Sequence, residues 1–132
     1  VTGHDSLLKG AKDTESLDHY RSSLYFAEAV KKARLYQPDR DALVIFAGAC
    51  QSNYEALMRA GANFASSPKR VFIHIFDPVL IIEKVAFASI QEVVTAEEAV
   101  EGTVTGADGI GGIETRGCFR RGYPNFTEAA LR

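Results

Sequence analysis

The sequence predicts an α/β domain in which a mainly parallel β-sheet lies between two layers of helices. The apolar run at 42–47 lacks polar alternation, which is typical of a strand covered on both faces. Strand-like and helix-like segments also alternate along the chain, as they do in α/β folds. The 132 residues are 46% hydrophobic and 24% charged, which is a globular composition, and we predict one domain over 1–132.

The first elements follow in order along the chain. Residues 1–3 have the character of the end of a strand, so we expect the carboxyl-terminal part of a longer chain whose upstream strands are missing. A polar connection over 4–21 follows. The next segment, 22–36, has helical periodicity and ends before Pro38. Its apolar stripe consists of Leu24, Ala27, Val30 and Ala33.

Four further elements are predicted after this helix. The strand 42–47 leads to a helix over 52–61, for which Gly61 is a carboxyl-terminal stop. A third strand is predicted over 71–75, which is apolar and rich in β-branched residues. A helix over 77–90 begins with an Asp-Pro pair suited to its first turn.

The last part of the chain predicts one more helix and then irregular structure. Thr95 and Glu98 form a capping box for a short helix that ends at Gly102. The segment 105–125 is rich in glycine, and we interpret it as irregular. Its stretch "GADGIGG" lacks the Lys-Ser/Thr pair of a phosphate-binding P-loop, so a loop is favoured there.

Charge and hydropathy favour neither nucleic acid nor a membrane as partner. The net charge is −2, whereas a general nucleic-acid surface needs a basic face. Lys69-Arg70, and Arg116 with Arg120-Arg121, are the candidates for a local basic patch. No run reaches the ~20 apolar residues that span a bilayer.

The two cysteines, Cys50 and Cys118, predict a reduced protein of the cytoplasm and no disulfide framework. No His, Cys or acidic residues have the spacing of metal ligands, so neither a metal nor a cofactor is expected. Cys118 lies among Arg and Gly residues, where thiolate character is possible, but no strand precedes it.

Cys50 and His4 are the candidate catalytic residues. Cys50 follows the strand 42–47, and His4 follows residues 1–3. If a right-handed crossover makes these strands parallel neighbours, both side chains emerge at one edge of the sheet. An imidazole beside a thiol favours the nucleophilic thiolate and can protonate a leaving amine. The backbone N–H of Cys50 is a candidate donor to an oxyanion.

Structural roles compete with these assignments. A free cysteine is usually a buried, inert side chain, and a histidine in a polar loop is usually solvated. His74 lies in the predicted strand 71–75, which favours a core histidine. His19 is expected to be exposed.

Five segments together resemble the YabG family of sporulation-specific bacterial proteases. The match covers nearly the whole chain, and the third segment is the most specific. The segments are "GHDS", "HYRSSLYFAEAVKKAR", "LVIFAGACQSNYEALMRAGANFASSPKR", "DPVLIIEKVAF" and "GIGGIETRG".

This resemblance implies a cysteine endopeptidase without a cofactor, active during spore formation and associated with the spore coat. It implies cleavage next to arginine in spore coat and germination-related proteins and in the protease itself. It also implies that Cys50 is the nucleophile and His4 its partner. The separation of 46 residues between them is similar to that in caspase-like peptidases such as clostripain, whose fold is an α/β sandwich.

One residue departs from the caspase-like pattern. Those peptidases carry Gly after the histidine, and its amide helps to form the oxyanion hole, whereas Asp5 follows His4 here. The backbone amide of Asp5 is the corresponding candidate donor. Asp77 and Glu114 are candidates for the acid that binds arginine, and a residue outside this chain is the alternative.

Two other functions remain open. A strand followed by a small residue, a cysteine and a helix also describes the nucleophile elbow of glutamine amidotransferase-like hydrolases, in which the later His74 would be the base. The other alternative is a non-enzymatic module of spore assembly with Cys50 buried.

Overall fold

The computed structural model describes residues 1–122, so the last part of the predicted domain, 123–132, lies outside the described residues. Ten elements follow one another along this part of the chain. They are η1 (Leu17–His19), α1 (Ser23–Tyr36), β1 (Phe46–Ala47), α2 (Tyr54–Ala60), β2 (Phe64–Ala65), α3 (Asp77–Phe87), β3 (Val93–Val94), α4 (Ala96–Glu101), β4 (Gly111–Gly112) and β5 (Thr115–Arg116).

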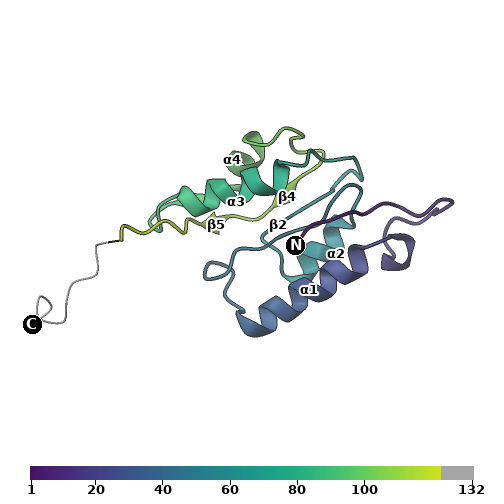
Figure 1. Cartoon of the computed structure of the whole chain (residues 1–132), viewed down its shortest axis with the longest axis horizontal. Coiled ribbons are helices and arrows are strands. Elements are labelled where there is room, and N and C mark those ends of the chain that lie inside the picture. The colour runs from purple at the N-terminus through teal and green to yellow at the C-terminus, as the bar shows by residue number, and fades with distance from the viewer. Residues whose placement is uncertain (123–132) are drawn as a thin grey trace, which may run out of the picture.

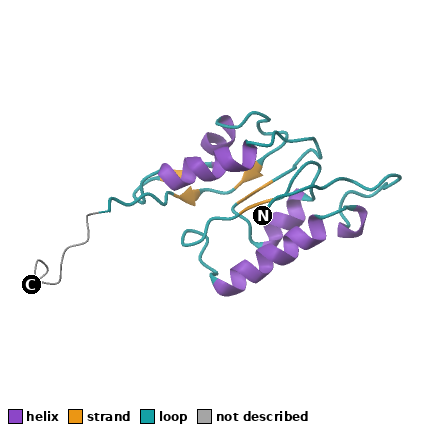
Figure 2. Ribbon diagram, viewed as in Figure 1, coloured by secondary structure: helices purple, strands orange, loops and turns teal. Residues whose placement is uncertain are grey.

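The strands form two small sheets, and helices lie on both sides of the first (Figure 1). β1 and β2 pair in parallel, β4 joins β2 in antiparallel orientation, and β3 pairs with β5 in antiparallel orientation. Figure 2 shows α1 and α2 on one side of the central strands and α3 and α4 on the other. The predicted α/β class is confirmed.

The predicted mainly parallel sheet is not observed. Among residues 1–122, one of the three strand pairs is parallel, because β4 returns along β2 as an antiparallel neighbour. The relationship to the caspase-like sandwich stays a prediction.

Two apolar clusters cover the two faces of the first sheet. Phe46 and Phe64 point toward α3 and α4, where they pack with Ile81 and Val85. Their neighbours in the sheet point toward α1 and α2 instead. That second cluster consists of Ala27, Val30, Ile45, Ala47, Leu57, Ala62 and Ala65. Burial on both faces explains why the run at 42–47 shows no polar alternation.

The four α-helices within residues 1–122 form where the sequence predicts them, within a few residues at each end. Asn53 caps α2 by accepting from the Ala56 N–H, and Gly61 ends it in the left-handed region at φ 119°. The predicted capping box of Thr95 and Glu98 is present at α4.

The predicted strand at 71–75 is wrong. This segment is irregular, and two of its apolar side chains, Phe72 and Ile75, are 73% and 80% exposed. Its neighbour is the turn around Cys50 rather than a strand, since the Gln51 N–H donates to Val71 O at 3.0 Å. The place beside β1 is taken by β2, a two-residue strand with too little sequence signal to be recognised.

Residues 1–3 lie beside β1, as predicted. The Val1 nitrogen donates to Phe46 O at 2.7 Å, and Val1 O accepts from the Gly48 N–H at 2.9 Å. These two bonds have the pattern of a parallel ladder in which Val1 faces Ala47. The connection that follows is anchored, because Leu7 bridges to Tyr20, whose side chain is buried.

Candidate active site

Cys50 lies on the turn that follows β1, and its side chain is half-buried. The backbone N–H of Ile73 donates to the sulfur at 3.4 Å, and the thiol donates to Ile73 O at 3.7 Å. A backbone N–H directed at the sulfur stabilises negative charge on it. The side chain is therefore held in place without being enclosed in the core.

The turn before Cys50 is fixed by two buried serines. Gly48 has a φ of 108°, the left-handed region that suits glycine. The Ala49 N–H donates to Ser52 Oγ at 2.9 Å, and Ser66 Oγ donates to Ala49 O at 2.6 Å. Among residues 1–122 the Cys50 N–H makes no hydrogen bond.

The segments that carry His4 and Cys50 lie side by side. Val1 faces Ala47 of β1, and Asp5 Oδ2 accepts from Ser52 Oγ at 2.7 Å, so contacts hold the two segments together on both sides of His4. The His4 side chain is exposed, and its ring makes no hydrogen bond within the described part of the chain.

Asp5 has an unexpected environment: its side chain is only 7% exposed. Oδ1 accepts from the backbone N–H groups of Ser6 at 2.9 Å and Ser22 at 2.7 Å. Oδ2 accepts from the hydroxyls of Ser23 at 2.5 Å and Ser52 at 2.7 Å. The residue after the candidate histidine thus binds the turn of the candidate nucleophile. The Asp5 N–H has no partner among residues 1–122.

Neither acid considered for arginine binding suits that role. Asp77 is fully buried and already accepts from the N–H groups of His74 and Val104 and from the Thr105 hydroxyl. Glu114 is exposed but lies at the opposite edge of the sheet, because antiparallel β4 carries the chain back past the amino end of β2.

The remaining sequence candidates lie outside the core. His74 is exposed and accepts from the Phe76 N–H, so the expected core histidine is wrong. His19 is half-buried rather than exposed, with a ring nitrogen 2.6 Å from Asp13 O. Cys118 is a free, exposed thiol. In the candidate basic patch at 69–70, each side chain is paired with a carboxylate.

Arg70 joins three segments, and these contacts have no signal in the sequence. Its guanidinium donates to Tyr20 Oη at 2.5 Å, to Thr14 O at 3.1 Å and to Glu55 Oε2 at 2.7 Å. Burial acts to raise the pKa of the Glu55 carboxyl, but the hydrogen bond and charge of Arg70 hold that pKa below its usual range.

This ion pair makes a testable contribution to acid stability. A carboxyl whose pKa is lower in the folded state stabilises the protein above its unfolded pKa of ~4.3, and this contribution is lost as pH falls through the folded pKa. Glu55→Gln is therefore expected to lower the free energy of unfolding at pH 6 and to have no effect well below pH ~4. The loss of unfolding free energy at pH 6 should stay under about 1 kcal/mol, because the Glu55 side chain is 52% exposed.

Urea unfolding at pH 6 and pH 3 measures the difference in unfolding free energy between the unmodified protein and Glu55→Gln. Glu28→Gln is the matched control, since Glu28 is an exposed glutamate of α1 that forms no ion pair among residues 1–122. A loss of unfolding free energy in Glu55→Gln that is the same at both pH values would contradict a stabilising ion pair between Glu55 and Arg70.

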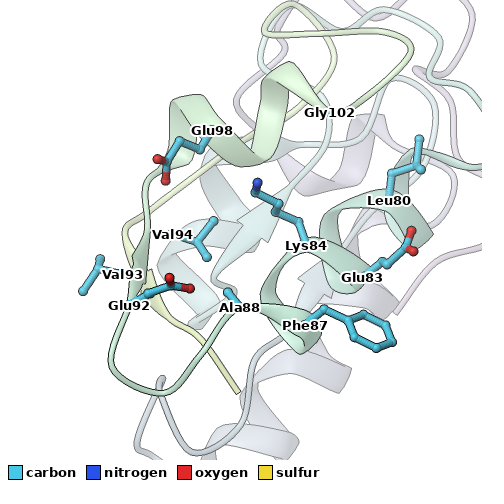
Figure 3. Close-up of a pocket in the computed structure, with 10 residues that line it drawn as sticks. All are labelled: Leu80, Glu83, Lys84, Phe87, Ala88, Glu92, Val93, Val94, Glu98 and Gly102. Atoms are coloured by element: carbon cyan, nitrogen blue, oxygen red, sulfur yellow. The ribbon is translucent and has the colours of Figure 1, made fainter. Parts of the chain in front are cut away.

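A separate cavity lies between α3, α4 and the chain that joins them (Figure 3). Lys84 of α3 and Glu98 of α4 line it together with Glu92 and apolar side chains such as Val94. None of its lining residues belongs to the turn around Cys50.

No group of three or more His, Cys, Asp or Glu side chains within 1–122 is placed to hold a metal ion. None of the helices described in that range has both the length and the apolar character needed to cross a membrane.

Comparison with known proteins adds a family and one curated relative. The sequence model of the family described as YabG peptidase U57 matches residues 1–124. The chain is 51% identical over 124 residues to the sporulation-specific protease YabG of Bacillus subtilis (strain 168). This match covers 94% of the chain and 43% of the relative, so the chain spans less than half the length of that protein. No solved structure matches the chain.

Proposed function

Because the chain belongs to the YabG peptidase family, we propose that it carries the catalytic centre of a cysteine endopeptidase that acts during sporulation. The observation that supports this most is the register of residues 1–3 against β1. We infer from this register that His4 and Cys50 lie at the same edge of the sheet, each three residues beyond the facing pair Val1 and Ala47. The Asp5–Ser52 hydrogen bond ties their two loops together.

In the proposed mechanism His4 takes the proton of the Cys50 thiol, and the resulting thiolate attacks the scissile carbonyl carbon. The carbonyl oxygen becomes an oxyanion that accepts from the N–H groups of Cys50 and Asp5. His4 then protonates the departing amine, and a thioester remains on the sulfur. His4 next removes a proton from water, the water attacks the thioester, and the carboxylic acid product leaves Cys50 free. Acid–base help of this kind supplies about 10²- to 10⁴-fold in rate.

The proposed substrates are spore coat and germination-related proteins, cleaved next to arginine, and the protease itself. The proposed location is the cytoplasm of the sporulating cell and the spore coat. Since Asp77 is saturated with donors and Glu114 lies at the other edge, we assign the arginine-binding acid to a residue outside this chain.

Comparing His4→Ala with His74→Ala tests the mechanism. We expect His4→Ala to lower kcat for an arginine-containing peptide by about 10²- to 10⁴-fold, and His74→Ala to leave kcat within about threefold. Each variant is assayed as part of the full-length protein by following product release. The reverse result would transfer the role of base to His74.

That reverse result would favour a glutamine amidotransferase-like hydrolase. One observation supports this alternative: His74 directly follows Ile73, whose backbone contacts the Cys50 sulfur. The third function, a non-enzymatic module of spore assembly, requires an inert thiol. Slow, pH-independent alkylation of Cys50 by iodoacetamide would support it.

A further inference from the structure

We propose that the Asp5 carboxylate is a positioning group of this active site, which holds the turn of Cys50 through the hydroxyl of Ser52 and thereby fixes it relative to His4. The inference rests on the proposed function, since it assigns Cys50 and His4 their catalytic roles. It assigns Asp5 a side-chain role in addition to the role of its backbone amide.

The burial of this carboxylate is fully compensated. Both oxygens of Asp5 accept two hydrogen bonds each, from the N–H groups of Ser6 and Ser22 and from the hydroxyls of Ser23 and Ser52. A carboxylate is an acceptor only, so four donors match what it can bind. Burying such a group is costly unless every partner is in place, which makes the arrangement specific in geometry.

The hydroxyl of Ser52 transmits this geometry to the nucleophile. Ser52 is fully buried, and its oxygen accepts from the Ala49 N–H at 2.9 Å. Its single proton is directed at Asp5 Oδ2, at 2.7 Å. The Ala49 N–H, Ser52 Oγ and Asp5 Oδ2 therefore form one chain of hydrogen bonds that ends one residue from His4.

The carbonyl oxygen of Ala49 is also fixed by a hydrogen bond. Ser66 Oγ donates to Ala49 O, so the peptide group between Ala49 and Cys50 is fixed. In a trans peptide the N–H points opposite to the C=O, which turns the Cys50 N–H away from Ser66. The direction of the Cys50 N–H, which we propose binds the oxyanion, is thus fixed by the hydroxyls of Ser52 and Ser66, which bind the two sides of Ala49. A displacement of about 1 Å in such a group can cost about 10²-fold in rate.

Asp5 also has a structural role that a test must separate. Its bonds to Ser22 and Ser23 lie at the start of α1, where a carboxylate stabilises the helix. Changing Asp5 itself would remove both roles together. Ser52→Ala removes the two hydrogen bonds of the Ser52 hydroxyl, which connect Asp5 to Ala49, and leaves the bonds of Asp5 to Ser22 and Ser23 at α1 in place.

Thr115→Val is the matched control. The Thr115 hydroxyl is also fully buried, accepts one hydrogen bond, from Asn63, and donates one, to Ile113 O. It lies in β5, beyond the edge opposite Cys50. Both substitutions remove a buried hydroxyl, so both are expected to lower the melting temperature.

The experiment compares kcat, KM and melting temperature of the full-length protein and the two variants on an arginine-containing peptide. Ser52→Ala is expected to lower kcat about 10- to 100-fold with KM within about twofold, and Thr115→Val to keep kcat within about twofold. Equal losses of kcat in the two variants, or an unchanged kcat in Ser52→Ala, would overturn the inference.

Failure of the proposed function gives a different result. If the unmodified protein does not cleave the peptide, the positioning role is read from the alkylation rate of Cys50 by iodoacetamide. Release of the turn is expected to speed alkylation several-fold in Ser52→Ala and not in Thr115→Val. Identical rates in both variants would overturn the inference without reference to proteolysis.

Discussion

Replacing Cys50 with alanine is expected to abolish proteolysis while the protein stays folded. Without the sulfur no thioester forms, and we expect the cleavage of an arginine-containing coat protein to fall by at least about 10³-fold. The Cys50 side chain is half-buried and its hydrogen bonds are those of a weakly binding sulfur, so the loss of unfolding free energy should be about 1 kcal/mol. Gel analysis of the substrate and thermal unfolding of the variant measure the two effects.

Cys118→Ala is the matched control for this experiment. Cys118 is the other free cysteine of the chain and is exposed. Its replacement should leave both cleavage and stability unchanged. Normal cleavage of the coat protein by Cys50→Ala would end the assignment of the nucleophile.

Replacing Gly48 with alanine is expected to cause a large loss of stability. Gly48 has a φ of 108°, and an added Cβ would lie 2.5 Å from Ser66 Oγ, 2.9 Å from Leu57 Cδ1 and 3.0 Å from Ser66 O. Backbone strain and overpacking together should lower the free energy of unfolding by about 2–4 kcal/mol. The displaced Ser66 would also release Ala49 O, so activity should fall as well.

Gly106→Ala separates the two causes. Gly106 has a φ of 79°, and nothing lies within 4 Å of the Cβ that would be added there. It should therefore show the cost of the backbone conformation alone, about 1–2 kcal/mol. Equal losses of unfolding free energy at Gly48 and Gly106 in urea titrations would contradict the tight packing of the turn before Cys50.

The helices of this protein are predictable from sequence because their signals are local. The periodicity of α1, Gly61 after α2 and the Thr95–Glu98 capping box each act within a few residues. The strands are only two residues long, and β2 is defined by its partners rather than by its own pattern. The exposed apolar residues of 71–75 had the composition of a strand without neighbours to pair with.

In the candidate site, too, local sequence signals are predictable and contacts between distant residues are not. Cys50 and His4 are predicted from sequence because each follows a segment with strand character, and their catalytic roles stay predictions. The contacts that hold the site join residues far apart in sequence, such as Asp5 with Ser52 and Arg70 with Thr14. The one local signal was an acidic residue at the position after the histidine. That residue predicts a changed oxyanion donor from its backbone amide, and it gives no indication of the buried contact between its side chain and Ser52.

The most direct test of this account is the distance between Cys50 Sγ and the His4 ring in a crystal structure of the protein with a peptide bound covalently to the cysteine. We expect a ring nitrogen of His4 within hydrogen-bond reach, about 3 Å, of the leaving-group position beside the sulfur. An imidazole turned toward another face of the molecule, with His74 beside the sulfur instead, would contradict it.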